Sequence, residues 1–248
     1  MILSVRHKFV FIKGMKVAGT SIEMALAPLC GPDDIITPIS PIDELERNRR
    51  GGRSQNYSTD RAVETAYLRR IAQAKPEELE TTPTGPQYFY NHMPLSEVLT
   101  RYPHPLAGFR VIGVERSPYA KVISWANMRL AYGGYRATGA PMRADPQMIR
   151  AYLDQSFENG RVLDCRNIDR YRGENGRLAV DLMRYADLPA TFDAFVRSLG
   201  LAPPPLPHAK KGLLSDDLDP RDILRPDQIA RIGTLFAEEF DLFGYPRI

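Results

Sequence analysis

The stretch that decides the fold is Lys8-Phe-Val-Phe-Ile-Lys-Gly-Met-Lys-Val-Ala-Gly-Thr-Ser-Ile-Glu-Met-Ala-Leu26. Its apolar run over residues 9–12, rich in aromatic and β-branched side chains, predicts a buried strand. A loop bounded by Gly14 and Gly19 follows, and apolar residues at helical spacing then predict a helix that begins near Thr20. Such a strand, loop and helix start can hold an anion, because the first N–H groups of a helix lack intrahelical partners and carry the positive end of its dipole.

The spacing of the two glycines nearly matches a loop that binds nucleoside triphosphates. That loop reads G-x4-G-K-[ST], and the chain has Gly14-x4-Gly19-Thr20-Ser21. Thr20 thus stands where a lysine is expected, and the loop carries its lysine at Lys16 instead. From that position the ammonium is expected to reach the bridging oxygen of a bound anion. Taken alone, the loop also fits an ordinary glycine-containing turn with a solvated lysine.

A second strand-to-helix junction lies about 100 residues later. Residues 111–114 predict an apolar strand, Ser117 is a good N-cap, and Pro118 suits the first helical position. Arg116 is therefore expected between strand and helix, at the carboxyl end of the sheet. Ser124 lies seven residues after Ser117 and shares its helix face. An arginine fork and a hydroxyl suit a phosphate monoester, since one offers paired charged bonds and the other a neutral donor.

The first loop resembles a signature of sulfotransferases that use 3′-phosphoadenosine 5′-phosphosulfate (PAPS). Met15-Lys-Val-Ala-Gly-Thr-Ser21 is similar to P-K-[TV]-[AG]-[GS]-T-S, with Met15 in place of the usual proline. The resemblance implies an enzyme with a P-loop nucleotide-kinase-like sulfotransferase fold, in which Lys16 assists sulfuryl transfer. It also implies that the loop binds the 5′-phosphosulfate, through Lys16, Val17, Ala18, Gly19, Thr20 and Ser21.

The second junction is similar to another sulfotransferase signature, R-x-P-x-x-[RK]-x-x-S. Arg116 and Ser124 occupy the two positions that the resemblance assigns to the 3′-phosphate of PAPS, and Pro118 and Lys121 also fit. The two signatures are independent and stand in the order found in the family. Phe243-Gly-Tyr245 resembles a common ending of these proteins. The resemblance therefore covers nearly the whole chain, strongly at two motifs and loosely elsewhere.

Two other functions fit parts of the same pattern. Residues 111–115 resemble the metal-binding strand of nucleoside triphosphatases, and a kinase or triphosphatase of that type needs Mg²⁺. The missing lysine after Gly19 counts against this interpretation. The third possibility is a non-catalytic module that binds nucleotides but lacks a working base. The leading hypothesis, sulfuryl transfer from PAPS with release of PAP, requires no metal, and the sequence shows no cluster of metal ligands.

A hydroxyl acceptor must lose its proton as it attacks, and a group that titrates near neutrality is best suited to take it. Of the four histidines, His92 alone directly follows a predicted strand, residues 87–91. The carboxyl ends of neighbouring strands are expected to bring it towards Lys16. Some sulfotransferases carry a histidine base in a comparable segment, within a pattern like His92-Met-Pro. Glu115 and Asp60 are the alternative bases.

The predicted strands and helices alternate, which indicates one α/β domain, residues 1–248, with a mainly parallel sheet flanked by helices on both faces. The net charge of +3 comes with no concentrated basic stripe, so no nucleic-acid partner is expected. No apolar run approaches the roughly 20 residues of a membrane span, and no signal peptide is expected. Cys30 and Cys165 are expected to be reduced thiols. These features predict a cytoplasmic protein.

Two intervals, residues 37–86 and 131–177, are expected to shape the acceptor site. Within them, residues 43–60, 133–146 and 165–177 are polar or rich in glycine and read as loops. The expected acceptor carries a hydroxyl or an amine, and the sequence does not distinguish a carbohydrate, a lipid or a small metabolite. Lys210 and Lys211 either reach a nucleotide phosphate or are exposed on a loop. Residues 226–240 are predicted to close the chain as one helix.

Overall fold

The computed structural model describes residues 1–79, 81–138, 144–207 and 219–248. The chain divides into two compact units, and each is described by itself. Unit 1 comprises Met1–Gly14, Ala18–Val114 and Asp169–Ala209; unit 2 comprises Met15–Val17, Glu115–Ile168 and Lys210–Ile248. Three residues of the glycine-bounded loop thus belong to unit 2, while the strand before the loop and the helix after it belong to unit 1.

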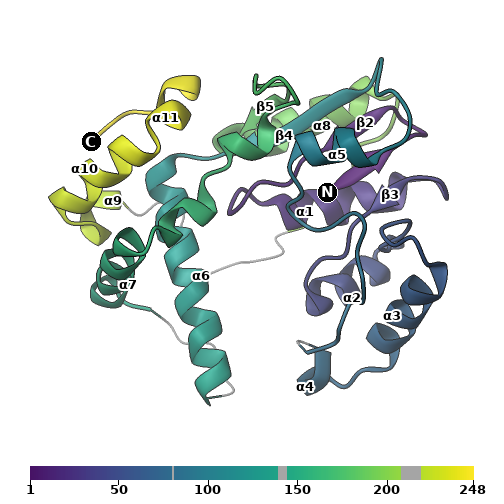
Figure 1. Ribbon diagram of the computed structural model, residues 1–248, viewed down its shortest axis with the longest axis horizontal. Helices are drawn as coiled ribbons and strands as arrows, with labels where there is room; N and C mark the ends of the chain where they lie inside the picture. The colour runs from purple at the N-terminus through teal and green to yellow at the C-terminus, as the bar shows by residue number, and fades with distance from the viewer. Residues whose placement is uncertain (80, 139–143, 208–218) are drawn as a thin grey trace. The chain divides into compact units, whose positions relative to one another are not determined.

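A five-stranded sheet runs through the fold in the order β3-β1-β2-β4-β5 (Figure 1). Its strands are β1 (Ile2–Ser4), β2 (Phe9–Phe11), β3 (Ile35–Ile36), β4 (Arg110–Glu115) and β5 (Asp181–Arg184). β2 and β4, the two strands that lead into the candidate motifs, are parallel and pair Phe9 with Arg110.

The sheet is mixed, rather than mainly parallel as the sequence suggested. β1 is antiparallel to both β2 and β3. Only residues 5–8 separate β1 from β2, and so short a connection can form a hairpin but no parallel crossover. The sequence interpretation placed the first strand at residue 9 and therefore missed this hairpin.

Helices surround the sheet in unit 1. They are α1 (Gly19–Leu26), α2 (Pro41–Arg49), α3 (Arg61–Gln73), α4 (Pro76–Leu79), α5 (Leu95–Arg101) and α8 (Leu188–Ser198). Short 3-10 turns occur at η1 (Ala27–Leu29), η3 (Ile168–Tyr171) and η4 (Tyr185–Asp187). The strands predicted over residues 9–12 and 111–114 and the helix predicted to begin near Thr20 are confirmed as β2, β4 and α1, with small differences at their ends.

The regular elements in the described part of unit 2 are helices and 3-10 turns, apart from the end of β4. Its elements are α6 (Pro118–Thr138), α7 (Pro146–Glu158), η2 (Arg161–Cys165), α9 (Pro220–Ile223), α10 (Pro226–Leu235) and α11 (Ala237–Phe243). They pack on a core that includes Trp125, Leu153 and Phe240. The single helix predicted over residues 226–240 is two helices, because the chain turns at Phe236, whose φ of −112° and ψ of 20° are not helical. Ile232, Phe236 and Phe240 are nevertheless buried, as their spacing predicted.

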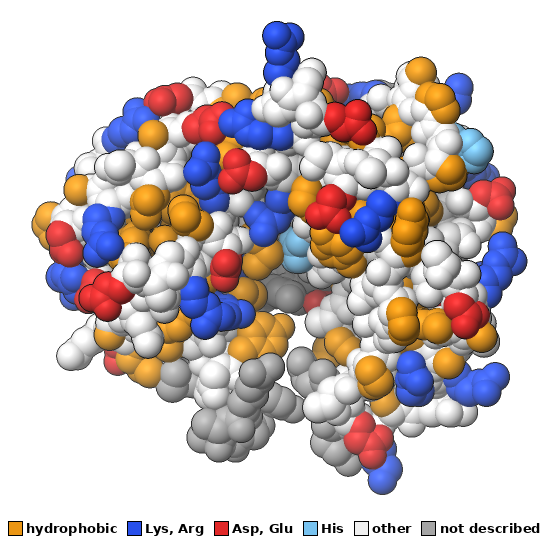
Figure 2. Space-filling model, viewed as in Figure 1, with side chains coloured by type: hydrophobic (Ala, Val, Ile, Leu, Met, Phe, Trp, Pro, Cys, Tyr) orange, Lys and Arg blue, Asp and Glu red, His pale blue; other side chains and the backbone are white. Residues whose placement is uncertain are grey.

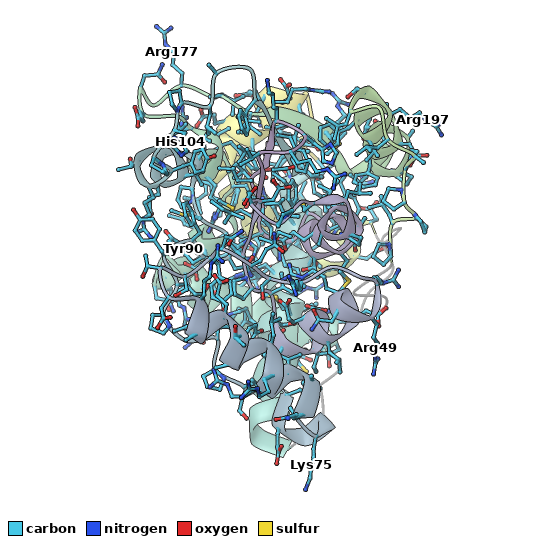
Figure 3. The ribbon with its side chains drawn as sticks, turned by 90° about the vertical axis from the view of Figure 1, so that its right-hand side faces the viewer. Arg49, Lys75, Tyr90, His104, Arg177 and Arg197 are labelled. Carbon is cyan, nitrogen blue, oxygen red and sulfur yellow. The ribbon has the colours of Figure 1, made fainter. Side chains whose placement is uncertain are left out.

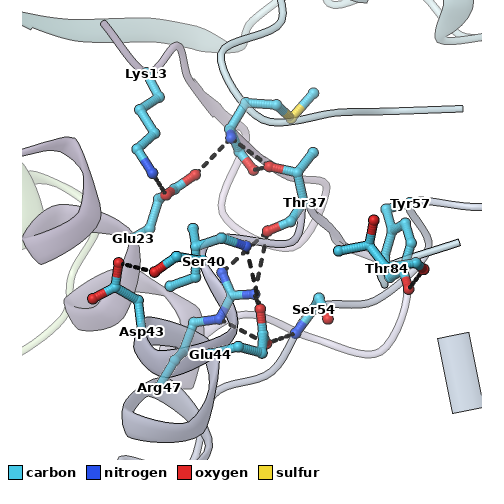
Figure 4. Close-up of polar contacts among 12 residues, drawn as sticks. Lys13, Glu23, Thr37, Ser40, Asp43, Glu44, Arg47, Ser54, Tyr57 and Thr84 are labelled. Carbon is cyan, nitrogen blue, oxygen red and sulfur yellow. Dashed lines mark hydrogen bonds and ion pairs between the residues drawn. The ribbon is translucent and has the colours of Figure 1, made fainter. Parts of the chain in front are cut away.

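The segment 43–60 was expected to be a solvated loop, and that expectation is wrong for residues 43–49, while residues 50–60 contain no helix. It begins inside α2, and the Arg47 side chain is fully buried, where it bonds Glu44 and the Thr37 carbonyl (Figure 4). Arg49, on the same helix, projects outward with a side chain that is 68% exposed (Figure 3). Arg47 therefore stabilises this region of unit 1.

Three further predictions are corrected. Residues 87–91 form no strand; the backbone N–H groups of Tyr88 and Phe89 instead both donate to the Tyr57 carbonyl, at 2.8 and 2.9 Å. Residues 133–138 continue helix α6, while 139–143 lie outside the described residues. The segment 165–177 lies at the surface only in part: residues 174–177 are exposed, but Cys165, Asn167 and Tyr171 are all fully buried. Lys210 and Lys211 also lie outside the described part of the chain.

Cys30 and Cys165 are both free thiols. Among the helices of the described residues, none combines the length and the apolar character needed to cross a bilayer. On the face seen in Figure 2, basic and acidic side chains are interspersed.

Candidate active site

In unit 1, a buried ion pair connects the strand before the loop with the helix after it. Lys13 follows β2 and is only 3% exposed, and its Nζ donates to Glu23 Oε2 on α1 at 2.6 Å (Figure 4). The amino group of Met1 donates to the other oxygen of Glu23, also at 2.6 Å. Burial opposes ionisation of Glu23, but the positive charge of Lys13, followed by smaller effects of the Met1 amino group and Arg47, outweighs it and lowers the pKa of Glu23 to about 2. The carboxylate therefore stays charged, and β2 and α1 are held together on either side of the loop.

Gly19 is required for the close approach of Lys13 to the start of α1. A Cβ atom on residue 19 would lie 2.5 Å from Cγ of Lys13, well inside van der Waals contact. The second glycine of the motif thus leaves room for the lysine side chain on its way to Glu23.

Two residues of the loop hold left-handed backbone conformations without being glycine. Lys16 and Ala18 both have φ of 60°, whereas Val17 between them does not have a positive φ. Each left-handed residue with a Cβ costs about 1 kcal/mol and persists only where its surroundings enforce it. Alternation of left-handed and ordinary residues turns successive N–H groups towards one side, the arrangement that binds anions in phosphate loops.

The first turn of α1 continues this row of donors. Ile22 N–H makes the first bond inside the helix, to the Ala18 carbonyl at 3.2 Å. The N–H groups of Gly19, Thr20 and Ser21 precede it and have no carbonyl within the helix to bond. Lys16, Ala18, Thr20 and Ser21 are all partly exposed, so the polar groups of the motif are accessible to a ligand.

In unit 2, Arg116 lies where the sequence placed it, between β4 and α6. Its N–H donates to Glu115 Oε1 at 2.9 Å, and α6 then begins with a bond of 2.9 Å from Lys121 N–H to the Ser117 carbonyl. Arg116 and Ser124 are partly exposed. Both side chains expected to hold a 3′-phosphate are therefore accessible on the same strand-to-helix junction.

Lys121 fits the second signature, but it is fully buried and does not face a ligand. Its Nζ donates to Glu115 at 2.7 Å and to Glu239 on α11. Burial lowers the pKa of Lys121, but the two carboxylates outweigh this effect and raise it, so the side chain stays protonated. Burial and the Glu239 carboxylate raise the pKa of Glu115. Glu115 is 1% exposed within this network, a position that no acceptor molecule reaches.

His92 contacts the strand end that leads into the loop. Its ring Nδ1 lies 3.1 Å from the Lys13 carbonyl, which can only accept, so Nδ1 carries the proton and Nε2 keeps its lone pair. Burial and then the charge of Lys13 lower the pKa of His92 well below its usual value. His92 does not follow a strand; it sits in a turn with φ of 61°. Its neutral ring and available lone pair are the properties of a base.

The alternative base Asp60 has another role. Its side chain accepts the Ala62 N–H at 2.8 Å and thereby caps the start of α3. The residue is exposed. Asp60 therefore serves helix α3.

The sequence analysis missed Asn167. Met15 N–H donates to Asn167 Oδ1 at 2.6 Å, and Asn167 Nδ2 donates to the Met15 carbonyl at 3.1 Å. Asn167 is fully buried, within the segment 165–177 that the sequence analysis had placed at the surface. One signal pointed to such a partner: proline has no N–H, and its replacement by Met15 adds a donor that needs an acceptor.

No protein-family model matches this chain, and a search of curated proteins found no significant match. The resemblance to sulfotransferases therefore depends on the two signatures and on the local geometry described above. Within residues 1–79, 81–138, 144–207 and 219–248, no three His, Cys, Asp or Glu side chains are grouped as metal ligands.

Proposed function

We propose that this protein is a PAPS-dependent sulfotransferase, which moves a sulfuryl group to a hydroxyl or an amine of an acceptor. The observation that carries the proposal is the backbone of the first signature: left-handed residues at Lys16 and Ala18 directly precede the start of α1. Strained non-glycine residues concentrate at ligand sites, and this alternation suits a bound anion. The second signature, about 100 residues later, supplies an accessible arginine and serine of the kind that a 3′-phosphate needs.

The loop would hold the phosphosulfate end of the nucleotide. PAPS supplies the sulfuryl group when bound, and negative charge then develops on the phosphate that it leaves. Lys16 and the N–H groups from Ala18 to Ser21 would stabilise that charge, an effect that depends on donors already in position. Sulfuryl transfer resembles phosphoryl transfer in needing alignment and charge stabilisation more than covalent help.

His92 is the proposed general base. A neutral imidazole with its proton on Nδ1 can accept the acceptor's proton at Nε2 as the hydroxyl attacks. The hydrogen bond to the Lys13 carbonyl fixes this tautomer and orients the ring. Arg116 and Ser124 would bind the 3′-phosphate and distinguish PAPS from nucleotides that lack it.

One observation weakens the alternative of an Mg²⁺-dependent kinase or triphosphatase. That interpretation uses the acid after residues 111–114 near the metal, but Glu115 is buried and paired with Lys121. A non-catalytic nucleotide-binding module would keep the loop and the second junction but would transfer no sulfate.

Two measurements test the proposal. Titration calorimetry with PAP and, separately, with ATP and Mg²⁺ is expected to show binding of PAP only. Transfer of labelled sulfate from PAPS to a panel of carbohydrate, lipid and small-molecule acceptors is expected to give a labelled product. Binding of ATP with Mg²⁺ but not of PAP would support the kinase class, and PAP binding without any transfer would support the binding module.

A further inference from the structure

The side chain of Asn167 bonds both backbone polar groups of Met15, a residue of the first signature. Its amide orientation is unambiguous, because the N–H of Met15 can only donate and the carbonyl can only accept. Met15 directly precedes Lys16, the first left-handed residue of the loop. The Asn167–Met15 contact thus fixes the peptide groups on both sides of Met15, and with them the direction in which the chain enters the strained segment.

Asn167 is itself held firmly inside unit 2. Its backbone N–H donates to Glu239 Oε1 at 2.6 Å, and the next N–H, of Ile168, donates to the same oxygen at 3.0 Å. The other oxygen of Glu239 pairs with Lys121. These bonds already fix the backbone at Asn167. The Asn167 side chain therefore loses little further conformational freedom when it bonds Met15, so it restrains the loop effectively.

The contact also explains the departure from the family pattern at Met15. A proline there would have no N–H for Asn167 Oδ1, and its ring would occupy the space where the 2.6 Å hydrogen bond now lies. Proline restrains a loop covalently by fixing φ. Here two hydrogen bonds from a residue 152 positions later restrain the same place.

We propose that Asn167 is a positioning residue for the anion-binding loop, which substitutes for the missing proline and keeps the loop in its ligand-binding conformation. The inference rests on the proposed function only for the identity of the ligand, PAP. Asn167 acts through Met15 and touches no reacting atom. Removing the Asn167 side chain should therefore loosen the loop and weaken PAP binding more than a general loss of protein stability would.

The test compares Asn167→Ala with Gln228→Ala. Gln228 is a matched control, since it is a fully buried carboxamide of unit 2 that accepts the Arg225 N–H and donates to the Arg150 carbonyl. It makes no contact with Met15 among the hydrogen bonds of the described residues. Both variants lose comparable hydrogen bonds, so a general loss of stability should affect them alike.

Hydrogen exchange of the Met15 and Lys16 amides, followed by NMR, and PAP affinity by calorimetry are the two readouts. Asn167→Ala is expected to speed exchange at these amides, and to weaken PAP binding, each by about tenfold, as expected for two lost hydrogen bonds. Gln228→Ala is expected to lower the melting temperature about as much as Asn167→Ala does. It should change neither the exchange rates of these amides nor the PAP affinity by more than about twofold. Equal effects in the two variants would overturn the proposal.

Two further outcomes are decisive. If Asn167→Ala does not fold, Asn167→Leu replaces it: leucine has nearly the same shape but no hydrogen-bonding group, so it loses both bonds to Met15 and faster exchange of the same amides is expected. Unchanged exchange in it would overturn the proposal. If the parent protein binds no PAP, the proposed function fails, whereas the positioning role still stands or falls on amide exchange alone.

Discussion

His92 donates from Nδ1 to the carbonyl of Lys13, and the 3.1 Å bond ties the imidazole to the strand end that enters the candidate loop. The same bond settles the tautomer and leaves the lone pair on Nε2. Burial and the charge of Lys13 keep the ring neutral at physiological pH. His92 is therefore a neutral ring of fixed orientation that can accept a proton. Its role can be tested by substitution and, independently, by lowering the pH.

His92→Ala is expected to reduce turnover by roughly 10² to 10⁴ and to leave PAP affinity unchanged, as for loss of a general base. Because the pKa of His92 is lowered, the parent's turnover should stay level through neutral pH and fall only well below pH 6.5. The pH profile of turnover in parent and variant is the measurement. A variant that keeps both the parent's rate and its acid limb would show that another group is the base.

The same shift makes a prediction about stability. A histidine with a lowered pKa when folded binds its proton mainly when unfolded, so its contribution is complete above about pH 6.5 and is lost as the pH falls below that value. Urea unfolding of the parent should show this loss, and His92→Ala should show less of it. An identical pH dependence in the two proteins would contradict a buried, neutral His92.

Lys16→Ala is expected to lower turnover by roughly 10² while PAP affinity changes only a few-fold, because the proposed charge interaction strengthens in the transition state. Steady-state kinetics and calorimetry measure the two effects. Weakened PAP binding with unchanged turnover would instead assign Lys16 to recognition of the bound nucleotide.

Arg116→Ala is expected to weaken PAP binding. It removes a charged contact that is made equally before and during the reaction, so PAP should bind about 2 kcal/mol more weakly. AMP lacks the 3′-phosphate and provides the control: its affinity should be the same for the parent and the variant. An equal loss of affinity for AMP would place Arg116 elsewhere on the nucleotide.

Gly19→Ala is expected to destabilise the protein by roughly 1 to 3 kcal/mol, the usual cost of forcing extra volume into a packed interior. The added Cβ would lie 2.5 Å from Cγ of Lys13. Gly133→Ala is the control, because Gly133 lies in helix α6 and a Cβ atom added there would meet nothing within 4 Å, so alanine should be neutral or slightly stabilising. Urea denaturation measures both, and a neutral Gly19→Ala would show that Lys13 has room to move.

Met15→Pro is expected to destabilise the protein although it restores the residue usual in the signature. The ring would meet Asn167 Oδ1 at the position of the present 2.6 Å bond. Adding Asn167→Ala should recover part of the lost melting temperature, since it removes the obstructing group. If the double variant is less stable than Met15→Pro alone, the two residues do not act through this contact.

Local sequence predicted the elements whose signals are local. The apolar run before Gly14, the helix after Gly19 and the Ser117-Pro118 helix start all lie where spacing and capping placed them, because each depends on side chains a few positions apart. The same is true of Arg116, whose place between strand and helix follows from its neighbours. These parts of the candidate site were accessible from the sequence alone.

Tertiary structure decided everything that depends on partners distant in the chain. The polar composition of residues 43–60 predicted a solvated loop. In the structure, Glu44 and the Thr37 carbonyl accept the hydrogen bonds of the Arg47 guanidinium, so this side chain can be buried. Lys121 fits the second signature, but it is buried and bonded to two carboxylates, one of them 118 residues later. The sequence determined which residues carry the chemistry of an anion site. Only the fold, through long-range bonds such as those of Asn167 to Met15, determined which of them are held accessible and which are used to hold the others.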